Sequence, residues 1–192
     1  MPKKTTSKTE TEQVTTTAAP VVAAAPAEKK TKKSAAAAAP APALGRVASS
    51  GPGFLRKIGK KGVSNGQFNY LRLMAWDQQG NVVVADEDNH RVQVVRLSDG
   101  ACLRTIGSQG SGAGRFNHPT GVAFDGAGNI VVADLRNHRV QVLRYSDGSH
   151  VRTIGSQGSA NGQFDRPWDV LIDGQGRIIV SDSGNDRIQV LQ

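Results

Sequence analysis

Hydrophobic and polar positions alternate with a period of two along most of residues 51–192, which is the pattern of short β-strands. Residues 130–133 form a continuous β-branched run that predicts a buried strand, and residues 139–145 alternate polar with apolar side chains. The Asp-Gly pair at 147–148 is typical of a tight hairpin turn, because glycine accepts a positive φ. This part of the pattern predicts an all-β region.

The same pattern is repeated three times at a fixed step. A-D-E-D-N-H-R-V-Q-V begins at Ala85, A-D-L-R-N-H-R-V-Q-V at Ala133 and S-D-S-G-N-D-R-I-Q-V at Ser181. The two steps are equal, with a period of 48 (133 − 85 and 181 − 133). Four short strands in a unit of this length are typical of a β-propeller blade. We expect repeats at about 66–113, 114–161 and, in part, 162–192, preceded by an opening outer strand at 54–58.

The string H-P-T-G-V-A-F-D-G-A-G-N-I-V-V-A-D-L-R-N-H-R-V-Q-V-L at 118–143 resembles the NHL repeat, and the similarity extends over about residues 54–192. NHL repeats build six-bladed propellers in many families. The resemblance therefore implies an all-β fold of three four-stranded blades, half of a six-bladed propeller. The third unit departs from the pattern at Ser181 and Asp186, and the first unit has Leu71 where the others have proline.

The number of blades is lower than in a closed ring. The expected strand order begins on an outer strand at 54–58 and ends on the third strand of a blade at 187–191. Three blades are fewer than the usual four to eight. Three explanations stay open: two chains form a homodimer with a six-bladed ring, the chain is a fragment of a longer product, or the blades form an open arc whose strand edges favour aggregation.

Residues 1–50 differ in composition from the repeats, since Ala, Pro, Thr and Lys dominate and aromatic residues are absent. We expect this tail to be disordered, because it offers too little apolar surface for a core. It carries 8 Lys and Arg against 3 Glu, a net charge of +5, and residues 51–192 carry 16 basic against 13 acidic residues, a net charge of +3. Lys-rich runs such as 29–33 are compatible with a nuclear address, a nucleic-acid-binding arm or a solvated linker.

Several classes of protein are excluded by what the sequence does not contain. No apolar run is long enough to span a bilayer, so no membrane partner is expected. The single cysteine, Cys102, suits a reducing compartment, and we expect a cytoplasmic protein, or a nuclear one because of the Lys-rich tail. No Cys/His cluster has zinc spacing and no nucleophile motif occurs, so we expect no cofactor, no metal and no catalytic residues.

Polar residues that recur in every repeat are expected to be structural. An Asp five residues before an Arg, across a tight turn, predicts an ion pair, and Asn side chains satisfy turn backbone groups. A residue required in every blade is architectural, because a catalytic site needs asymmetry. This repeated clamp consists of Asp86, Asn89 and Arg91, of Asp134, Asn137 and Arg139, and of Asp182, Asn185 and Arg187.

Residues that differ between repeats are better candidates for binding. The connectivity places the loop before the first strand of each blade and the turn between its second and third strands at the same end. Variable aromatic and cationic residues on a constant scaffold are typical of binding surfaces, although ordinary loop variation explains them equally well. The binding-face candidates are Tyr70, Arg72, His118, Thr120, Arg136, Arg166 and Trp168.

The resemblance implies a non-catalytic interaction platform, because NHL propellers of tripartite-motif proteins bind protein partners and, in some cases, single-stranded RNA. A protein partner is the first expectation, and RNA is the second, held mainly by the basic tail. One alternative is a metal-dependent lyase or hydrolase similar to the NHL-type amidating lyases, although their histidine ligands are not matched here. The other is the substrate-recognition part of a ubiquitin-ligase system whose RING lies elsewhere.

Overall fold

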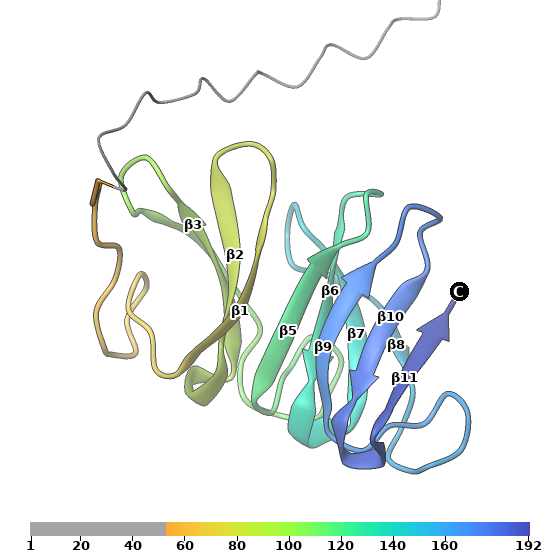
Figure 1. Cartoon of the computed structure of the whole chain (residues 1–192). Helices are drawn as coiled ribbons and strands as arrows, with labels where there is room; N and C mark the ends of the chain where they lie inside the picture. The colour runs from red at the N-terminus through yellow and green to blue at the C-terminus, as the bar shows by residue number, and fades with distance from the viewer. Residues whose placement is uncertain (1–52) are drawn as a thin grey trace, which may run out of the picture. The chain divides into compact units, whose positions relative to one another are not determined.

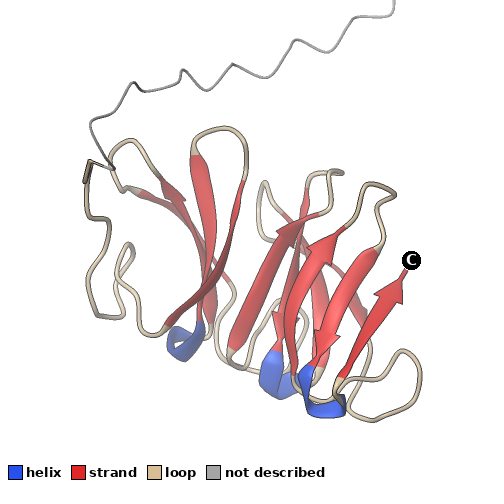
Figure 2. Cartoon of the chain, in the orientation of Figure 1, coloured by secondary structure: helices blue, strands red, loops and turns tan. Residues whose placement is uncertain are grey.

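The computed structural model describes residues 53–192, and the expectation of a disordered tail at 1–50 lies outside them. Three antiparallel sheets lie side by side (Figure 1), and strands, short helical turns and loops make up the described residues (Figure 2). The prediction of an all-β fold built from propeller blades is confirmed. No helix among residues 53–192 has the length and apolar character needed to cross a membrane.

Each sheet follows the chain order, with the first strand of the repeat innermost. The first sheet contains β1 (Leu71–Trp76), β2 (Asn81–Asp86), β3 (Arg91–Arg96) and β4 (Cys102–Ile106). The second contains β5 (Pro119–Phe124), β6 (Asn129–Asp134), β7 (Arg139–Arg144) and β8 (His150–Ile154). The third contains β9 (Pro167–Ile172), β10 (Ile178–Asp182) and β11 (Arg187–Leu191). Short 3-10 turns, η1 (Glu87–Asn89), η2 (Leu135–Asn137) and η3 (Ser183–Asn185), join the second and third strands of each sheet.

The hydrophobic core lies between neighbouring sheets. Val83 and Val94 of the first sheet pack with Phe116 and Ile130 of the second repeat, and an equivalent cluster joins the second and third repeats. Burial of each such side chain contributes about 1.5–3 kcal/mol. The two clusters therefore hold β1, β5 and β9 next to one another around the inner side of the arc (Figure 1).

A glycine beside each core phenylalanine is required by close packing. Gly107 has a φ of +84°, and a Cβ built on it would lie 2.4 Å from the ring of Phe116. Only glycine satisfies both the left-handed backbone and the absence of space. This explains why the Ile-Gly pair recurs at Gly59, Gly107 and Gly155 with the same step as the phenylalanines.

The third sheet has three strands, as expected from a strand order that ends on the third strand of a blade at 187–191. One detail differs from the expected order. The segment at 54–58, expected as an opening outer strand, is not a strand in the single chain. A strand needs a hydrogen-bonded neighbour, and within residues 53–192 no third strand of a preceding blade lies beside this segment.

The expected clamp is formed at equivalent positions in all three sheets. Asp134 is fully buried and accepts hydrogen bonds from the Asn117 amide (2.7 Å), Asn137 Nδ2 (2.9 Å) and Arg139 Nε (2.9 Å). Asn137 Nδ2 also donates to the Gly110 carbonyl, which belongs to the long loop before β5. The clamp therefore fastens the loop before the first strand to the turn that follows the second strand.

A buried glutamine completes each clamp and was missed by the sequence reasoning. Gln141 Nε2 donates to Asp134 (3.1 Å) and to the Arg115 carbonyl (2.6 Å), and its Oε1 accepts from the Gly114 amide. Gln93 and Gln189 make the equivalent bonds. The signal was present in the sequence, because the glutamine of the V-Q-V or I-Q-V triplet recurs in every repeat.

The clamp generates a prediction about stability. We expect Asp134→Ala to lower the free energy of unfolding by about 3 kcal/mol, because Arg139, Asn137 and the Asn117 amide lose a buried acceptor. Denaturant unfolding measures this loss. The control is Asp147→Ala, an exposed carboxylate that accepts from the Ser149 amide (2.8 Å) and should cost less than about 1 kcal/mol. Equal effects of the two substitutions would show that the clamp assignment is wrong.

Candidate functional site

The turns η1, η2 and η3 and the loops before β1, β5 and β9 lie at one end of the sheets, and we call this end the loop face (Figure 2). Backbone hydrogen bonds join each turn to its loop: the amides of Asp88, Arg136 and Gly184 donate to the carbonyls of Asn69, Asn117 and Asp165. The structure places all seven binding-face candidates at or next to this end. The arrangement follows from the clamp, because the same bonds recur in every repeat.

Three of the candidates occupy strained backbone positions. Tyr70, His118 and Arg166 stand at the same place in successive loops and have φ values of 59°, 55° and 51°. Residues other than glycine are uncommon in this left-handed region, and tyrosine and arginine are less common there than asparagine, aspartate or histidine, so the surrounding bonds must impose it on Tyr70 and Arg166. The Tyr70 carbonyl accepts from the Glu87 amide, and the Arg166 carbonyl accepts from Ser183 Oγ. Strained loop residues held in this way present their side chains in a defined direction.

Arg72 connects an acidic residue and two aromatic residues of the loop face. Its guanidinium donates to the buried carboxylate of Glu87, and it lies 4.9 Å from the ring centroids of both Tyr70 and Trp168. The hydrogen bond from Arg72 to Glu87 is the main reason why the pKa of Arg72 is raised. Each cation–π contact contributes about 0.5–1 kcal/mol at exposed sites. Tyr70 and Trp168 are 63% and 37% exposed, so both rings are held in place yet accessible.

Thr120 is not available for binding. Its side chain is fully buried, and Oγ1 donates to the Trp168 carbonyl at 2.6 Å. Thr120 was predicted to lie on the binding face because its position varies between repeats. Its variation instead reflects a contact between the second and third blades, which positions the backbone of Trp168.

His118 and His90 form a contact between the first two blades. The rings meet edge to face with centroids 4.5 Å apart, and the His118 amide donates to His90 Nδ1 at 3.1 Å. Burial lowers the pKa of His90, and the nearby His118 lowers it further. The bond requires Nδ1 of His90 to be unprotonated, which agrees with the direction of the shift. His138 accepts from the Arg166 amide in the same way at the next blade contact.

Glu87, Asp88 and His118 come together although the sequence reasoning did not group them. One ligand atom from each lies within 4.8 Å of the others, and His118 Nδ1 is 3.5 Å from both carboxylates. Two carboxylates and an imidazole suit a divalent cation. Glu87, however, is already paired with Arg72, whose positive charge opposes a cation at this place. The cluster joins loops of two different repeats, and for that reason no local spacing could have revealed it.

Two exposed arginines of the loop face belong to the second and third blades. Arg136 and Arg166 are both exposed, and the side chain of Arg166 is 63% exposed with Asp165 3.6 Å away. His138 Nδ1 also lies 3.2 Å from Asp165. The loop face thus combines an aromatic centre over Arg72 with two accessible guanidinium groups at one side.

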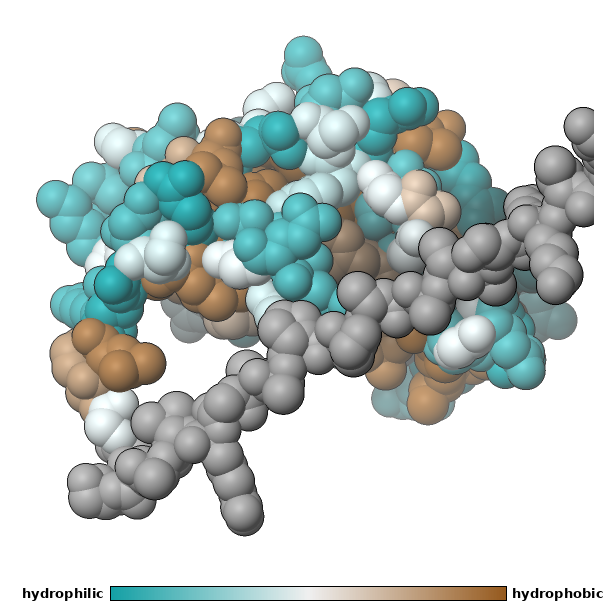
Figure 3. Space-filling view, turned by 90° about the horizontal axis from the view of Figure 1, so that it is seen from above, coloured by the Kyte–Doolittle hydropathy of each residue, from teal (hydrophilic) through white to brown (hydrophobic). Residues whose placement is uncertain are grey.

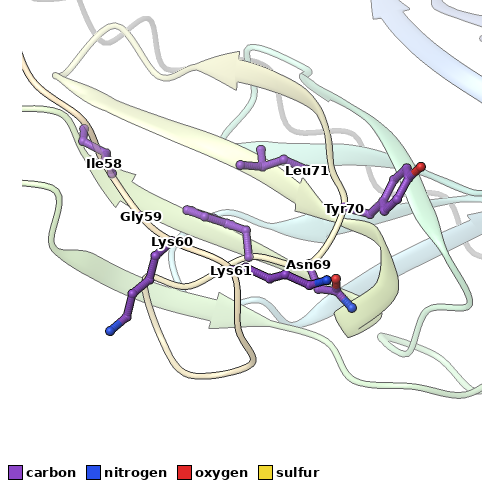
Figure 4. Close-up of a pocket in the computed structure, with 8 residues that line it drawn as sticks. Ile58, Gly59, Lys60, Lys61, Asn69, Tyr70 and Leu71 are labelled. Carbon is purple, nitrogen blue, oxygen red and sulfur yellow. The ribbon is translucent and has the colours of Figure 1, made fainter.

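An open pocket lies at the first blade, next to the loop face. It has a volume of about 360 Å³ and is lined by Ile58, Gly59, Lys60, Lys61, Phe68, Asn69, Tyr70 and Leu71 (Figure 4). The opposite end of the sheets, seen from above, is mostly hydrophilic with apolar patches between the polar side chains (Figure 3). On the loop-face side, Tyr70 belongs to both features, because it lines the pocket and also contacts Arg72.

Three stretches of the chain match the NHL repeat, at residues 68–95, 116–143 and 164–191. Among solved structures, the chain is similar to the WD40 β-propeller domain of Doa1, with 19% identity and a TM-score of 0.50 over 67% of this chain and 38% of that chain. It is also similar to a catalytically inactive virginiamycin B lyase from Staphylococcus aureus with Quinupristin, with 11% identity and a TM-score of 0.50 over 69% of this chain and 39% of that chain. The likeness at these identities shows the β-propeller fold alone.

The chain spans less than half the length of each of these two structures. No curated protein sequence matches it significantly. The resemblance expected from the repeated phrases is confirmed, because the matched stretches follow one another at the period of those phrases.

The His90 contact generates a prediction about pH. The folded-state pKa of His90 lies below the ordinary value of 6.5. As the pH falls below that value, the unfolded chain therefore binds more protons than the folded chain. The stability that neutral His90 contributes is therefore present above about pH 6.5 and is lost as the pH falls below it. We expect the melting temperature to drop more between about pH 7.5 and pH 5.5 in the parent than in His90→Asn, whose amide oxygen keeps an acceptor. Equal drops would contradict this role.

Proposed function

Because the chain is an NHL-repeat protein with a β-propeller fold, we propose that it is a non-catalytic platform that binds a protein partner through the loop face. The observation that carries the proposal is the cluster in which Arg72 lies between Tyr70 and Trp168. Tyrosine, tryptophan and arginine are the residue types enriched at binding hot spots. Repeat proteins bind through the residues that vary on such a constant scaffold.

The cluster is organised before any partner arrives, and this lowers the entropic cost of binding. Arg72 is held by Glu87, and Tyr70 is held by its strained backbone and the bond from the Glu87 amide. Ordering a long side chain at an interface costs about 0.5–1.5 kcal/mol, and here most of that ordering precedes association. The positioned rings therefore favour a specific contact over a weak, adaptable one.

The charges of the loop face indicate what kind of segment it binds. Arg136 and Arg166 are exposed guanidinium groups, whereas Arg72 is neutralised by Glu87. Arginine recognises carboxylates through paired hydrogen bonds. We propose that the partner presents an apolar or aromatic group to Tyr70 and Trp168 and a carboxylate to Arg166 or Arg136.

A metal-dependent lyase is the alternative that the grouping of Glu87, Asp88 and His118 favours. A cation at this place would compete with Arg72 for Glu87 and would have to disrupt the Arg72 cluster. Binding of a partner, in contrast, leaves the contacts of Arg72 with Glu87, Tyr70 and Trp168 as they are. For this reason we place the platform first.

Variants of the loop face test the platform. We expect Trp168→Ala and Arg166→Glu each to weaken partner binding about tenfold or more, as loss of a hot-spot residue does. The matched control is Arg144→Glu, the same change of charge on an exposed residue at the opposite end of β7. Calorimetric titration with a partner captured by the parent protein measures the affinities, and melting curves verify the fold. Equal binding by Arg166→Glu and Arg144→Glu would contradict the proposal.

Any RNA binding is assigned to the basic tail rather than to the loop face. The tail carries a net charge of +5 over 50 residues, and residues 51–192 carry +3. Phosphate contacts from such a tail are sequence-independent and sensitive to salt. We expect a chain trimmed to residues 51–192 to lose nearly all RNA affinity in a filter-binding assay while it keeps its protein partner. Tight, sequence-specific RNA binding by the trimmed chain, abolished by Tyr70→Ala, would instead make the loop face an RNA-binding site.

A further inference from the structure

The outer face of the third sheet is apolar and exposed. Ile188 and Val190 of β11 are 72% and 55% exposed, and Leu171 of β9 is 58% exposed. At the positions of the second sheet equivalent to those in β11, Val140 and Val142 are almost completely buried against the third repeat. The third sheet therefore keeps the apolar surface of a blade-to-blade contact, and nothing among residues 53–192 covers it.

The first sheet exposes the complementary face. Met74 of β1 is 58% exposed, whereas the equivalent Val122 and Val170 are buried against the preceding sheet. An apolar pocket of about 160 Å³ opens on this face between Met74, Leu71 and Leu97. The uncovered face of the third sheet and that of the first sheet are equivalent to the two sides of the interface that joins the first sheet to the second and the second to the third.

The segment at 53–58 occupies the place of an outer strand that belongs to a preceding blade. Ile58 packs with the core cluster of the first sheet and against Gly100, as Ile106 packs against Gly148 one repeat later. Ile106, however, belongs to β4 and is paired with β3, whereas residues 53–58 have no neighbouring strand. Within the described residues, β11 has no neighbour on its outer side. One end of the arc thus offers the strand that the other end lacks.

We propose that a second copy of this chain covers both faces, so that two copies form one closed six-bladed ring. Six blades lie within the usual four to eight of closed propellers, and a twofold axis closes the assembly without leaving open faces. The outer strand of the third blade of each copy is supplied by residues 54–58 of the other copy. The proposal goes beyond the binding function, which needs only the loop face of one chain.

The repeat period determines the register of the new strand pair. Val92 pairs with Ile106 and Val140 with Ile154, so Ile188 pairs with Ile58 of the second copy. By the same rule, Val190 pairs with Arg56 of the second copy, because Val94 pairs with Arg104 and Val142 pairs with Arg152. The pairing is antiparallel and places Val190 against the first sheet of the second copy, since its equivalents are buried against the next sheet.

The turn at the end of the third blade provides a polar contact for the same interface. His90 Nδ1 accepts from the His118 amide, and His138 Nδ1 accepts from the Arg166 amide. In the third blade the residue equivalent to these histidines is Asp186, and the equivalent amide is that of Tyr70 in the second copy. The exposed Asp186 carboxylate would therefore accept from the loop that lines the pocket in Figure 4. The loop faces of the two copies then join into one surface.

Sedimentation equilibrium of the 192-residue chain at micromolar concentration tests the assembly. We expect twice the mass of 20.2 kDa for the parent and for the control Val151→Lys, which changes an exposed apolar residue of β8 away from the new interface. Ile188→Lys should be monomeric yet folded, because its side chain is exposed in the single chain. A monomeric parent, an open polymer, or a dimer that persists in Ile188→Lys would each overturn the proposal.

Disulfide trapping tests the register independently. In a Cys102→Ala background, Arg56→Cys with Val190→Cys should form a covalent dimer under mild oxidation, since directly opposed strand positions satisfy disulfide geometry. Lys57→Cys with Val190→Cys is the control, because a shift of one residue turns the side chain to the other face. Non-reducing gels show the outcome. Trapping of the control pair, or failure of the first pair, would overturn the proposed register.

Discussion

The structure depends on a fully buried carboxylate in each repeat, Asp86, Asp134 and Asp182. A buried charge is costly unless it is paired and hydrogen-bonded. Asp182 accepts from the Asp165 amide, Asn185, Arg187 and Gln189, so both of its carboxylate oxygens are satisfied. Burial acts to raise the pKa of Asp182, but these hydrogen bonds outweigh it and hold the pKa below the ordinary value.

The donors to this carboxylate come from four different parts of a repeat. In the third repeat, the Asp165 amide belongs to the loop before the first strand and Asn185 belongs to the turn. Arg187 begins the third strand, and Gln189 lies two residues further along it. Since one buried carboxylate connects all four, the loop cannot move without breaking the clamp. A rigid loop of this kind permits the positive φ of Tyr70, His118 and Arg166. The clamp is thus the physical reason why variable residues are held in defined positions on the loop face.

The blade-to-blade contacts explain which residues of the loop face are accessible. Thr120 varies between repeats, but its hydroxyl is buried and donates to the Trp168 carbonyl, so a partner cannot reach it. His118 is largely enclosed by His90 and Glu87. Tyr70, Arg166 and Trp168 remain exposed because no neighbouring strand among residues 53–192 covers them. The contacts between blades also leave two apolar faces open at the ends of the arc. The same packing rule therefore governs the binding surface and the proposed assembly.

Most of the fold could be predicted from the sequence because its causes are local and periodic. Alternation with a period of two indicated the strands, and the spacing of Asp134, Asn137 and Arg139 within one turn predicted the clamp. Residues 54–58 are not a strand in the single chain, because a strand forms only beside a partner strand, and the partner is not a local property of the sequence. The sequence by itself determined the blade and its repeat. Only the tertiary structure decided that Arg72 lies between Tyr70 and Trp168 and that Glu87 lies beside His118. The Arg72–Trp168 and Glu87–His118 contacts join residues of different repeats, and the period of the sequence does not show which residues of different repeats touch.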